Sequence, residues 1–106
     1  MPTTFEVVAE PARRELLDLL IDGPRSVGEL VSATGLSQPN TSRHLRVLRE
    51  AGLVESRPDG QRRLYELRPD GLAELLRWLA PYRRRWRASL DRLERHLDGD
   101  PRTKEE

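Results

Sequence analysis

Apolar residues recur at steps of three and four along most of the chain, which is the spacing of one face of an α-helix. A first short run begins at Phe5 and stops before Pro11, because proline disfavours a helical conformation in the residue before it. A second, leucine-rich run stops at Gly23 and Pro24. The spacing predicts helices over residues 5–9 and 12–21.

Two further helices are indicated by the residues that would begin and end them. Ser26 and Glu29 have the spacing of a capping box, in which each side chain binds a free backbone N–H of the other. Gly35 then suits a helix end, and Ser37 suits the start of the next helix, which Gly52 would end. These signals predict helices over 27–34 and 38–51.

After Gly52 the apolar period changes from helical to alternating. Residues 53–57 and 62–67 are predicted to be strands, joined by the turn-forming sequence Pro58-Asp59-Gly60-Gln61. Tyr65 and Leu67 share one face of the second strand. We expect a β-hairpin with a basic tip that carries Arg57, Arg62 and Arg63.

The last long apolar stripe recurs at helical spacing from Leu72 to Leu97 and continues through Pro81. A proline inside a helix removes a hydrogen bond and bends it, so the stripe predicts one long bent helix or two abutting helices. Asp70 is expected to cap this region. Residues 99–106 are predicted to form a disordered tail.

Composition limits the chain to one modest domain, which we place at residues 1–98 with a C-terminal dimerisation helix or helices from about residue 70. Charged residues (35%) nearly equal apolar ones (36%), so a monomer would have a thin core and a second subunit is expected. No leader or membrane-spanning run is evident, which favours a cytoplasmic protein. The net charge is only +1, but residues 36–68 carry seven Arg against four acids.

The fold class that follows is mainly α with a two-stranded β-hairpin. Two helices joined by a tight turn and followed by a hairpin are typical of a winged helix-turn-helix. On helix 38–51, Thr41, Leu45 and Leu48 fall within about 60° at ~100° per residue, which marks the buried face. Arg43 and Arg46 then lie on the nearly opposite, exposed face of the helix.

The exposed side of that helix has the chemistry needed to bind DNA. Gln and Asn can bind an adenine edge with two hydrogen bonds, Arg can do so with guanine, and a helix N-terminus suits a phosphate. Two roles are equally compatible with the position of His44: it contacts a phosphate, or it flanks the core. The predicted DNA-binding residues are Ser37, Gln38, Asn40, Ser42, Arg43, His44, Arg46, Arg57, Arg62 and Arg63.

The segment from Leu36 to Val54 resembles the recognition segment of ArsR-type regulators, and Pro11-Ala12-Arg13-Arg14 resembles the early helix of that family. The hairpin, ending in Tyr65-x-Leu67, is similar to its wing. The resemblance covers roughly residues 5–68. It implies a homodimeric repressor of double-stranded DNA, often acting on its own promoter, in which a small-molecule effector, unknown here, weakens DNA binding.

The metal-sensing members of that family carry cysteines or Asp/His sets, and this chain departs from them. It has no cysteine, and the relevant positions offer only Glu29 and the set Asp91, Glu94 and His96. Ser42 and His44 are about 200° apart on their helix and make no catalytic pair. We therefore expect no metal, no cofactor and no enzymatic activity, as in the small autorepressors of the family.

The dimer interface is predicted on the C-terminal stripe, with help from the first helix. Its residues are Phe5, Val8, Leu79, Tyr82, Trp86, Leu90 and Leu93. Two other interpretations stay open: the set Trp78, Tyr82 and Trp86 could line a ligand pocket, and Arg83, Arg84, Arg85 and Arg87 could bind nucleic acid rather than form a solvated face. The alternative function is a winged-helix module that binds proteins without specific DNA binding.

Overall fold

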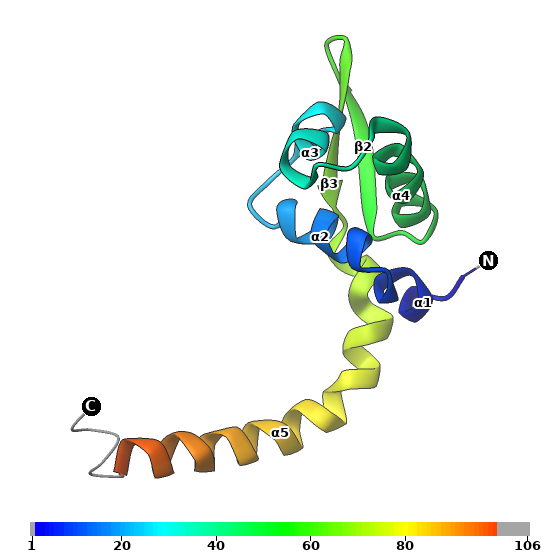
Figure 1. Cartoon of the computed structure of the whole chain (residues 1–106). Coiled ribbons are helices and arrows are strands. Elements are labelled where there is room, and N and C mark those ends of the chain that lie inside the picture. The colour runs from blue at the N-terminus through cyan, green and yellow to red at the C-terminus, as the bar shows by residue number, and fades with distance from the viewer. Residues whose placement is uncertain (1, 100–106) are drawn as a thin grey trace. The chain divides into compact units, whose positions relative to one another are not determined.

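The computed structural model describes residues 2–99, and its internal contacts divide the chain into two compact units that meet between Leu75 and Leu76. The helices are α1 (Thr4–Ala9), α2 (Pro11–Leu19), α3 (Val27–Thr34), α4 (Gln38–Glu50) and α5 (Ala73–Gly99), with a 3₁₀ turn η1 (Pro69–Leu72); the strands are β1 (Arg25–Ser26), β2 (Val54–Asp59) and β3 (Arg62–Leu67). The first unit has the predicted winged helix-turn-helix arrangement (Figure 1).

Two arginines of α2 hold the end of α1. The Arg14 guanidinium donates to the carbonyl oxygens of Val8 (2.8 Å) and Ala9 (3.1 Å), and Arg13 donates to that of Val7 (3.4 Å). The last carbonyls of a helix have no partner within it, so a cationic donor from the next helix stabilises them. The adjacent arginines therefore have a structural role in fixing the α1–α2 corner.

The helix-turn-helix is formed by α3 and α4 with the predicted caps. Ser26 and Glu29 form the full capping box, with Oγ of Ser26 accepting from the Glu29 N–H at 3.2 Å and the Glu29 carboxylate accepting from the Ser26 N–H at 3.1 Å. Gly35 ends α3 with φ of 74°, a left-handed conformation that glycine adopts without strain. The tight turn between the helices was thus predicted correctly.

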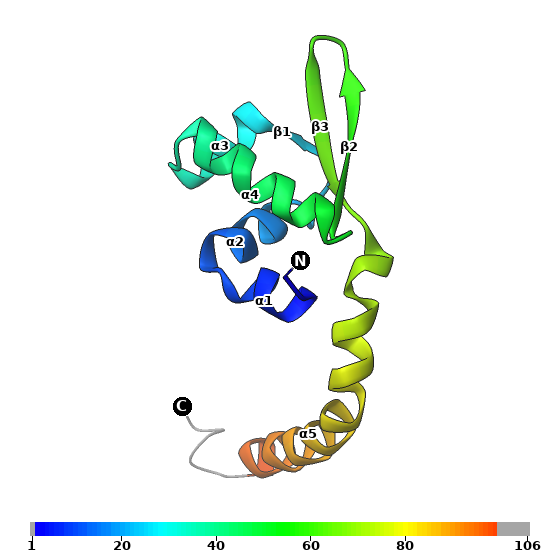
Figure 2. The same ribbon diagram turned by 90° about the vertical axis from the view of Figure 1, so that its right-hand side faces the viewer.

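The sheet has three strands, one more than predicted, in the order β1-β3-β2 (Figure 2). Arg25 and Ser26 pair with Tyr65 and Leu64, and a strand of two residues is too short to show an apolar period. Strand β2 also extends through Pro58, which an edge strand tolerates because one side of it needs no hydrogen-bond partner. The hairpin turn therefore shortens to two residues, Gly60 and Gln61, with φ of 66° at the glycine.

The core lies where α1–α4 pack on the sheet. Its buried apolar residues are Val7, Leu16, Leu20, Leu30, Leu45, Leu48, Leu53 and Val54. Thr41 is fully buried as predicted, and its hydroxyl donates to the Ser37 carbonyl at 2.9 Å. Among the described residues, no buried side-chain nitrogen or oxygen lacks a hydrogen-bond partner. In α1 it is Val7 that enters the core, while Phe5 is exposed and Val8 is half-buried.

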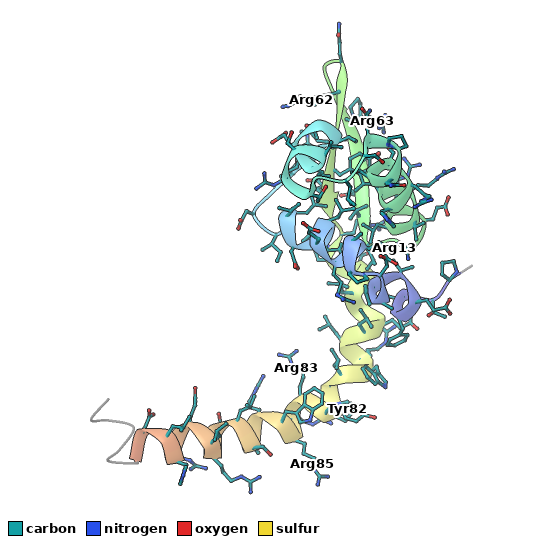
Figure 3. The ribbon with its side chains drawn as sticks, in the orientation of Figure 1. Arg13, Arg62, Arg63, Tyr82, Arg83 and Arg85 are labelled. Atoms are coloured by element: carbon teal, nitrogen blue, oxygen red, sulfur yellow. The ribbon has the colours of Figure 1, made fainter. Side chains whose placement is uncertain are left out.

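Helix α5 is one continuous helix with Pro81 inside it, and its ribbon bends beside Tyr82 (Figure 3). The prediction that Asp70 caps this region is wrong. Asp70 lies inside η1, whose first residue is preceded by Arg68, and it forms an ion pair with Arg68 at 3.2 Å. Within residues 2–99, no helix is long and apolar enough to cross a membrane. Apart from Gly99, which ends α5, the predicted tail lies outside the described residues.

Candidate nucleic-acid interface

The N-terminal turn of α4 presents polar side chains on a fixed backbone. Oγ of Ser37 accepts from the N–H of Asn40 at 3.2 Å, which uses one of its two lone pairs and leaves its O–H free to donate. Gln38, Asn40 and Ser42 are exposed. Three side chains with free donors or acceptors therefore surround the positive end of the helix dipole.

The next turn of α4 carries the two predicted arginines on the side away from the core. Arg43 and Arg46 are exposed, whereas Leu45 and Leu48 are fully buried. Because the buried leucines fix how α4 rotates about its axis, the arginines project from the opposite face. Their guanidinium groups are available for hydrogen bonds with a partner.

His44 has an internal partner that the sequence did not indicate. Nε of Arg13 donates to Nδ1 of His44 at 3.3 Å, which links α2 to α4. Burial of the ring lowers the pKa of His44 below 6.5, and the nearby charges of Arg13 and Arg43 lower it further. The imidazole therefore accepts at Nδ1 in its neutral form, which favours a packing role over a phosphate contact.

The hairpin arginines lie on two faces rather than in one cluster. Arg62 and Arg63 point to opposite sides of the hairpin, as neighbours in a strand do (Figure 3). Arg62 is paired with Asp59 at 3.2 Å and with Glu29 of α3 at 3.5 Å. Arg57 is paired with Glu66 at 3.4 Å. These two arginines are already partly neutralised by acids of the same chain.

The other face of the hairpin holds a pair of arginines that converge on one hydroxyl. Oγ of Ser56 accepts from Arg63 at 3.1 Å and from Arg49 of α4 at 3.5 Å. Among the described residues, neither guanidinium is ion-paired with a carboxylate, so two positive charges meet there without an acid. Arg49 was not among the predicted contacts, because only the packing of α4 on the hairpin brings it to Ser56.

Glu29 connects the start of α3 to the hairpin. Hydrogen bonds from the backbone and side chain of Ser26 lower the pKa of Glu29, and the charges of Arg62 and Arg25 lower it further. The carboxylate thus stays ionised at neutral pH and holds Arg62 close to the helix-turn-helix. This fixes where one side of the hairpin lies.

The comparisons with known proteins concern the segment that contains this surface. Residues 10–56, from α2 into β2, match the family model described as bacterial regulatory protein, arsR family. The chain is 47% identical over 73 residues to an uncharacterised HTH-type transcriptional regulator of Mycobacterium tuberculosis, covering 68% of this chain and 64% of that protein. It is 30% identical over 79 residues to the transcriptional repressor SdpR of Bacillus subtilis, covering 74% of this chain and 88% of the repressor.

The chain belongs to the ArsR family. A solved structure described as a possible transcriptional regulator for arsenical resistance has a TM-score of 0.71 and 43% identity, with coverage of 91% of this chain and 97% of that one. A homodimeric winged helix-turn-helix DNA-binding domain from Mycobacterium bovis, described as a possible ArsR-family regulator, has a TM-score of 0.62 and 32% identity over 74% of this chain and 72% of that one. The matched part of this ArsR-family chain spans less than two thirds of the length of the Mycobacterium tuberculosis regulator.

The second unit of this ArsR-family chain carries apolar side chains that its own residues leave open. Tyr82 is 45% exposed, Trp86 52%, Leu90 58% and Leu93 51%, while Leu79 is half-buried. The ring of Tyr82 lies 5.2 Å from that of Trp78 and 5.9 Å from that of Trp86. The rings of Trp78, Tyr82 and Trp86 thus form a continuous row along α5.

Charged side chains of α5 lie on more than one side of the helix (Figure 3). Arg83 and Arg85 point to different sides of the helix (Figure 3). Asp91, Glu94 and His96 are all exposed. Within residues 2–99, no three His, Asp or Glu side chains come together in a group that could hold a metal ion.

Proposed function

We propose that this protein is a sequence-specific transcription regulator that binds double-stranded DNA as a homodimer and represses transcription. The observation that carries the proposal is the exposed face of α4, where amide and guanidinium groups project opposite a fully buried leucine face. A module that bound only proteins would not need base-reading side chains in this arrangement. Family membership supports the same conclusion.

In this proposal the start of α4 enters the major groove. Gln38 and Asn40 bind base edges from the first turn, and Arg43 and Arg46 do so from the next. The hydroxyls of Ser37 and Ser42, beside the positive end of the helix, bind a phosphate oxygen. The residues that contact bases differ from those that contact phosphates, so specificity and positioning can be tested separately.

Phosphate contacts on the hairpin come from both of its faces. Arg63 and Arg49 offer two cations with no acid beside them and a shared hydroxyl, so they are the stronger phosphate site. Arg57 and Arg62 must first give up part of their ion pairs with Glu66, Asp59 and Glu29. His44 supports α4 through Arg13 and contacts DNA at most from its second ring nitrogen.

Dimerisation would cover the apolar row of α5. A helix of 27 residues is about 40 Å long at ~1.5 Å per residue, and its exposed tryptophan and leucines need a second surface. A second copy of the same row is the simplest such surface, since most soluble oligomers are symmetric. The proposed interface comprises Phe5, Val8, Leu79, Tyr82, Trp86, Leu90 and Leu93, and the homodimeric relative from M. bovis supports it.

A two-fold dimer implies a two-fold target. The operator would be an imperfect palindrome with half-sites about 34 Å apart, in successive major grooves on one side of the duplex. We place the protein in the cytoplasm, with its own promoter as the first operator to test. A small-molecule effector would act by weakening this complex.

The test measures DNA affinity by fluorescence anisotropy against salt, with the protein's own upstream region and a scrambled duplex. We expect tighter binding to the upstream region and a steep linear fall of log affinity with log salt. The double variant Gln38→Ala/Asn40→Ala should lose the preference and keep the salt slope. Equal, weak and salt-independent binding to both duplexes would favour the protein-interaction module instead.

A further inference from the structure

A pocket of about 330 Å³ lies in the winged-helix unit, and none of its lining residues belongs to the set proposed for DNA or for dimerisation. We call it the junction pocket, because it lies where α2, the turn after α4 and the exit from β3 meet. Its apolar wall comprises Leu17, Ile21, Leu53, Leu67, Pro69 and Leu72. Protein sites for small molecules begin at about 300 Å³ and are mostly apolar with a few polar groups, which is the description of this one.

The rim of the junction pocket carries one negative charge that no neighbouring cation balances. Arg68 and Asp18 both line it. The Arg68 guanidinium lies 3.2 Å from the Asp70 carboxylate, so its charge is already balanced. Within residues 2–99, the Asp18 carboxylate has no hydrogen bond or ion pair. The rim therefore favours a cation over an anion.

Backbone hydrogen bonds connect the wall of the pocket to α4. The N–H of Leu53 donates to the carbonyl of Leu48 in the last turns of α4 at 3.0 Å, and the carbonyl of Leu53 accepts from the N–H of Arg68 at 2.9 Å. Leu53 is only 1% exposed, so its side chain also belongs to the core. A displacement of Leu53 would therefore strain its hydrogen bonds to Leu48 of α4 and to Arg68 after β3.

A second contact joins the same two segments. Gly71 of η1 packs so closely on Gly52 that a Cβ at position 71 would overlap the Gly52 carbonyl. Gly52 is the second residue after the end of α4, and Gly71 lies between Pro69 and Leu72 of the pocket wall, so a shift of one backbone displaces the other. A molecule that shifts Leu72 or Pro69 would therefore shift the C-terminal end of α4.

We propose that the junction pocket binds a small apolar molecule with one cationic group, whose apolar part contacts the leucines while the cation lies beside Asp18. We further infer that occupancy changes the affinity of α4 for DNA through Leu53 and the Gly52–Gly71 contact. The second statement rests on the proposed function, whereas the first does not. The chemical class of the ligand follows from the apolar wall and the unbalanced carboxylate.

The binding experiment uses the full chain and three probes of matched shape: 2-phenylethylamine, 2-phenylethanol and 3-phenylpropanoate. Titrations are followed by amide chemical shifts in NMR spectra. We expect shifts at Ile21, Leu53 and Leu72, and binding of the amine about three- to fivefold tighter than the alcohol at low salt, as one exposed ion pair allows. The carboxylate should bind most weakly.

Two variants test the assignment of the wall and the rim. Asp18→Asn should remove the preference for the amine over the alcohol, while Glu15→Gln, on the same helix but outside the pocket, should keep it. Ile21→Trp should weaken all three probes by about tenfold, since Ile21 is 67% exposed and a larger ring there fills the pocket rather than the core.

The coupling is tested by repeating the DNA titration with the pocket saturated by 2-phenylethylamine. The affinity for the upstream duplex should change at least about fivefold, the lower end of measured couplings between sites, and Ile21→Trp should abolish that change while still binding DNA. Unchanged DNA affinity under saturation would overturn the coupling. Failure of DNA binding without any probe would instead contradict the proposed function and leave the NMR result standing.

Three results would overturn the pocket itself: no shifts with any probe, shifts centred on α5, or equal affinities for the amine and the carboxylate. Shifts at Ile21 and Leu72 that depend on protein concentration without any probe would show that a second copy of the chain covers this surface. That outcome would also contradict the proposal.

Discussion

The winged-helix unit and the α5 segment after Leu75 cover their apolar side chains to very different extents. Leu16, Leu45 and Leu48 are 0% exposed, whereas Trp86 and Leu90 are 52% and 58% exposed. Burial of apolar area is the main favourable term in folding, so the first unit contains its own source of stability, whereas the described residues of the second bury little apolar area. In the function proposed above, the first unit would present side chains to DNA, and the second would set how many copies of the chain bind.

The strongest change should be in the stability of the winged-helix unit. Leu45→Ala should lower the free energy of unfolding by about 2–5 kcal/mol, because it leaves a cavity in a packed core. The loss should be the same at every protein concentration. Leu90→Ala should lower stability only at concentrations where the dimer forms. Chemical denaturation over a wide range of protein concentration checks both, and equal, concentration-independent losses would remove the distinction between the two units.

The next largest effect is on assembly. Trp86→Asp would place a charge in the proposed interface at a cost of roughly 3 kcal/mol or more, so sedimentation velocity should show monomer. The monomer should keep the folded winged-helix unit but lose specific DNA binding. Ala88→Asp adds the same charge about 200° around α5 from Trp86 and should remain dimeric. A dimeric Trp86→Asp protein would place the interface elsewhere.

Within the winged-helix unit, the α4 arginines should act on sequence preference. Arg43→Ala and Arg46→Ala are expected to cost about 1–3 kcal/mol on the operator and to relax the preference at particular base pairs. Affinity for random DNA should change less. Binding to a set of single-base operator variants measures this, and equal losses on operator and random duplex would assign both arginines to the phosphates.

A smaller effect separates the two faces of the hairpin. Arg63→Ala should weaken binding to all duplexes and reduce the slope of log affinity against log salt by about one, the loss of a single phosphate contact. Arg62→Ala should change the slope less, because Asp59 and Glu29 already neutralise part of that charge. A larger change for Arg62→Ala than for Arg63→Ala would reverse the assignment of the faces.

The smallest effect is the pH dependence that comes from Glu29. Its pKa is lower in the folded chain than the ordinary 4.5, so the unfolded chain binds more protons in that range. The stabilisation is therefore fully present above pH 4.5 and is lost as pH falls through the lower folded value. In Glu29→Gln, the difference in unfolding free energy from the unchanged protein should shrink on acidification. A difference that grows instead would show that the carboxylate is destabilised by folding.

Local signals in the sequence were sufficient for most of the fold. The capping box at Ser26 and Glu29, the cap at Ser37 and the glycines after α3 and α4 act within a few residues, so their effect can be predicted without knowing the fold. Strand β1 could not be predicted, because its two residues become a strand only by pairing with β3. The Asp70 error has a similar cause, since Arg68 and the packing of Gly71 determine how that segment turns.

The candidate site divides in the same way. The exposure of Arg43 and Arg46 follows from the helical period and the leucines opposite, and it was predicted. The contact of Arg13 with His44 joins residues 31 apart in the chain, and the convergence of Arg49 and Arg63 on Ser56 requires the packing of α4 on the hairpin. Contacts made by tertiary packing carry no local signal, so only the structure reveals them.

In the proposed complex, two winged-helix units joined through α5 bind the two half-sites of one operator. The most direct measurement combines hydroxyl-radical footprinting of the upstream duplex with the mass of the complex in sedimentation equilibrium. We predict two chains per duplex and two protected segments about one helical turn apart on the same side of the DNA. A single chain per duplex that protects the full operator would rule out binding as a homodimer.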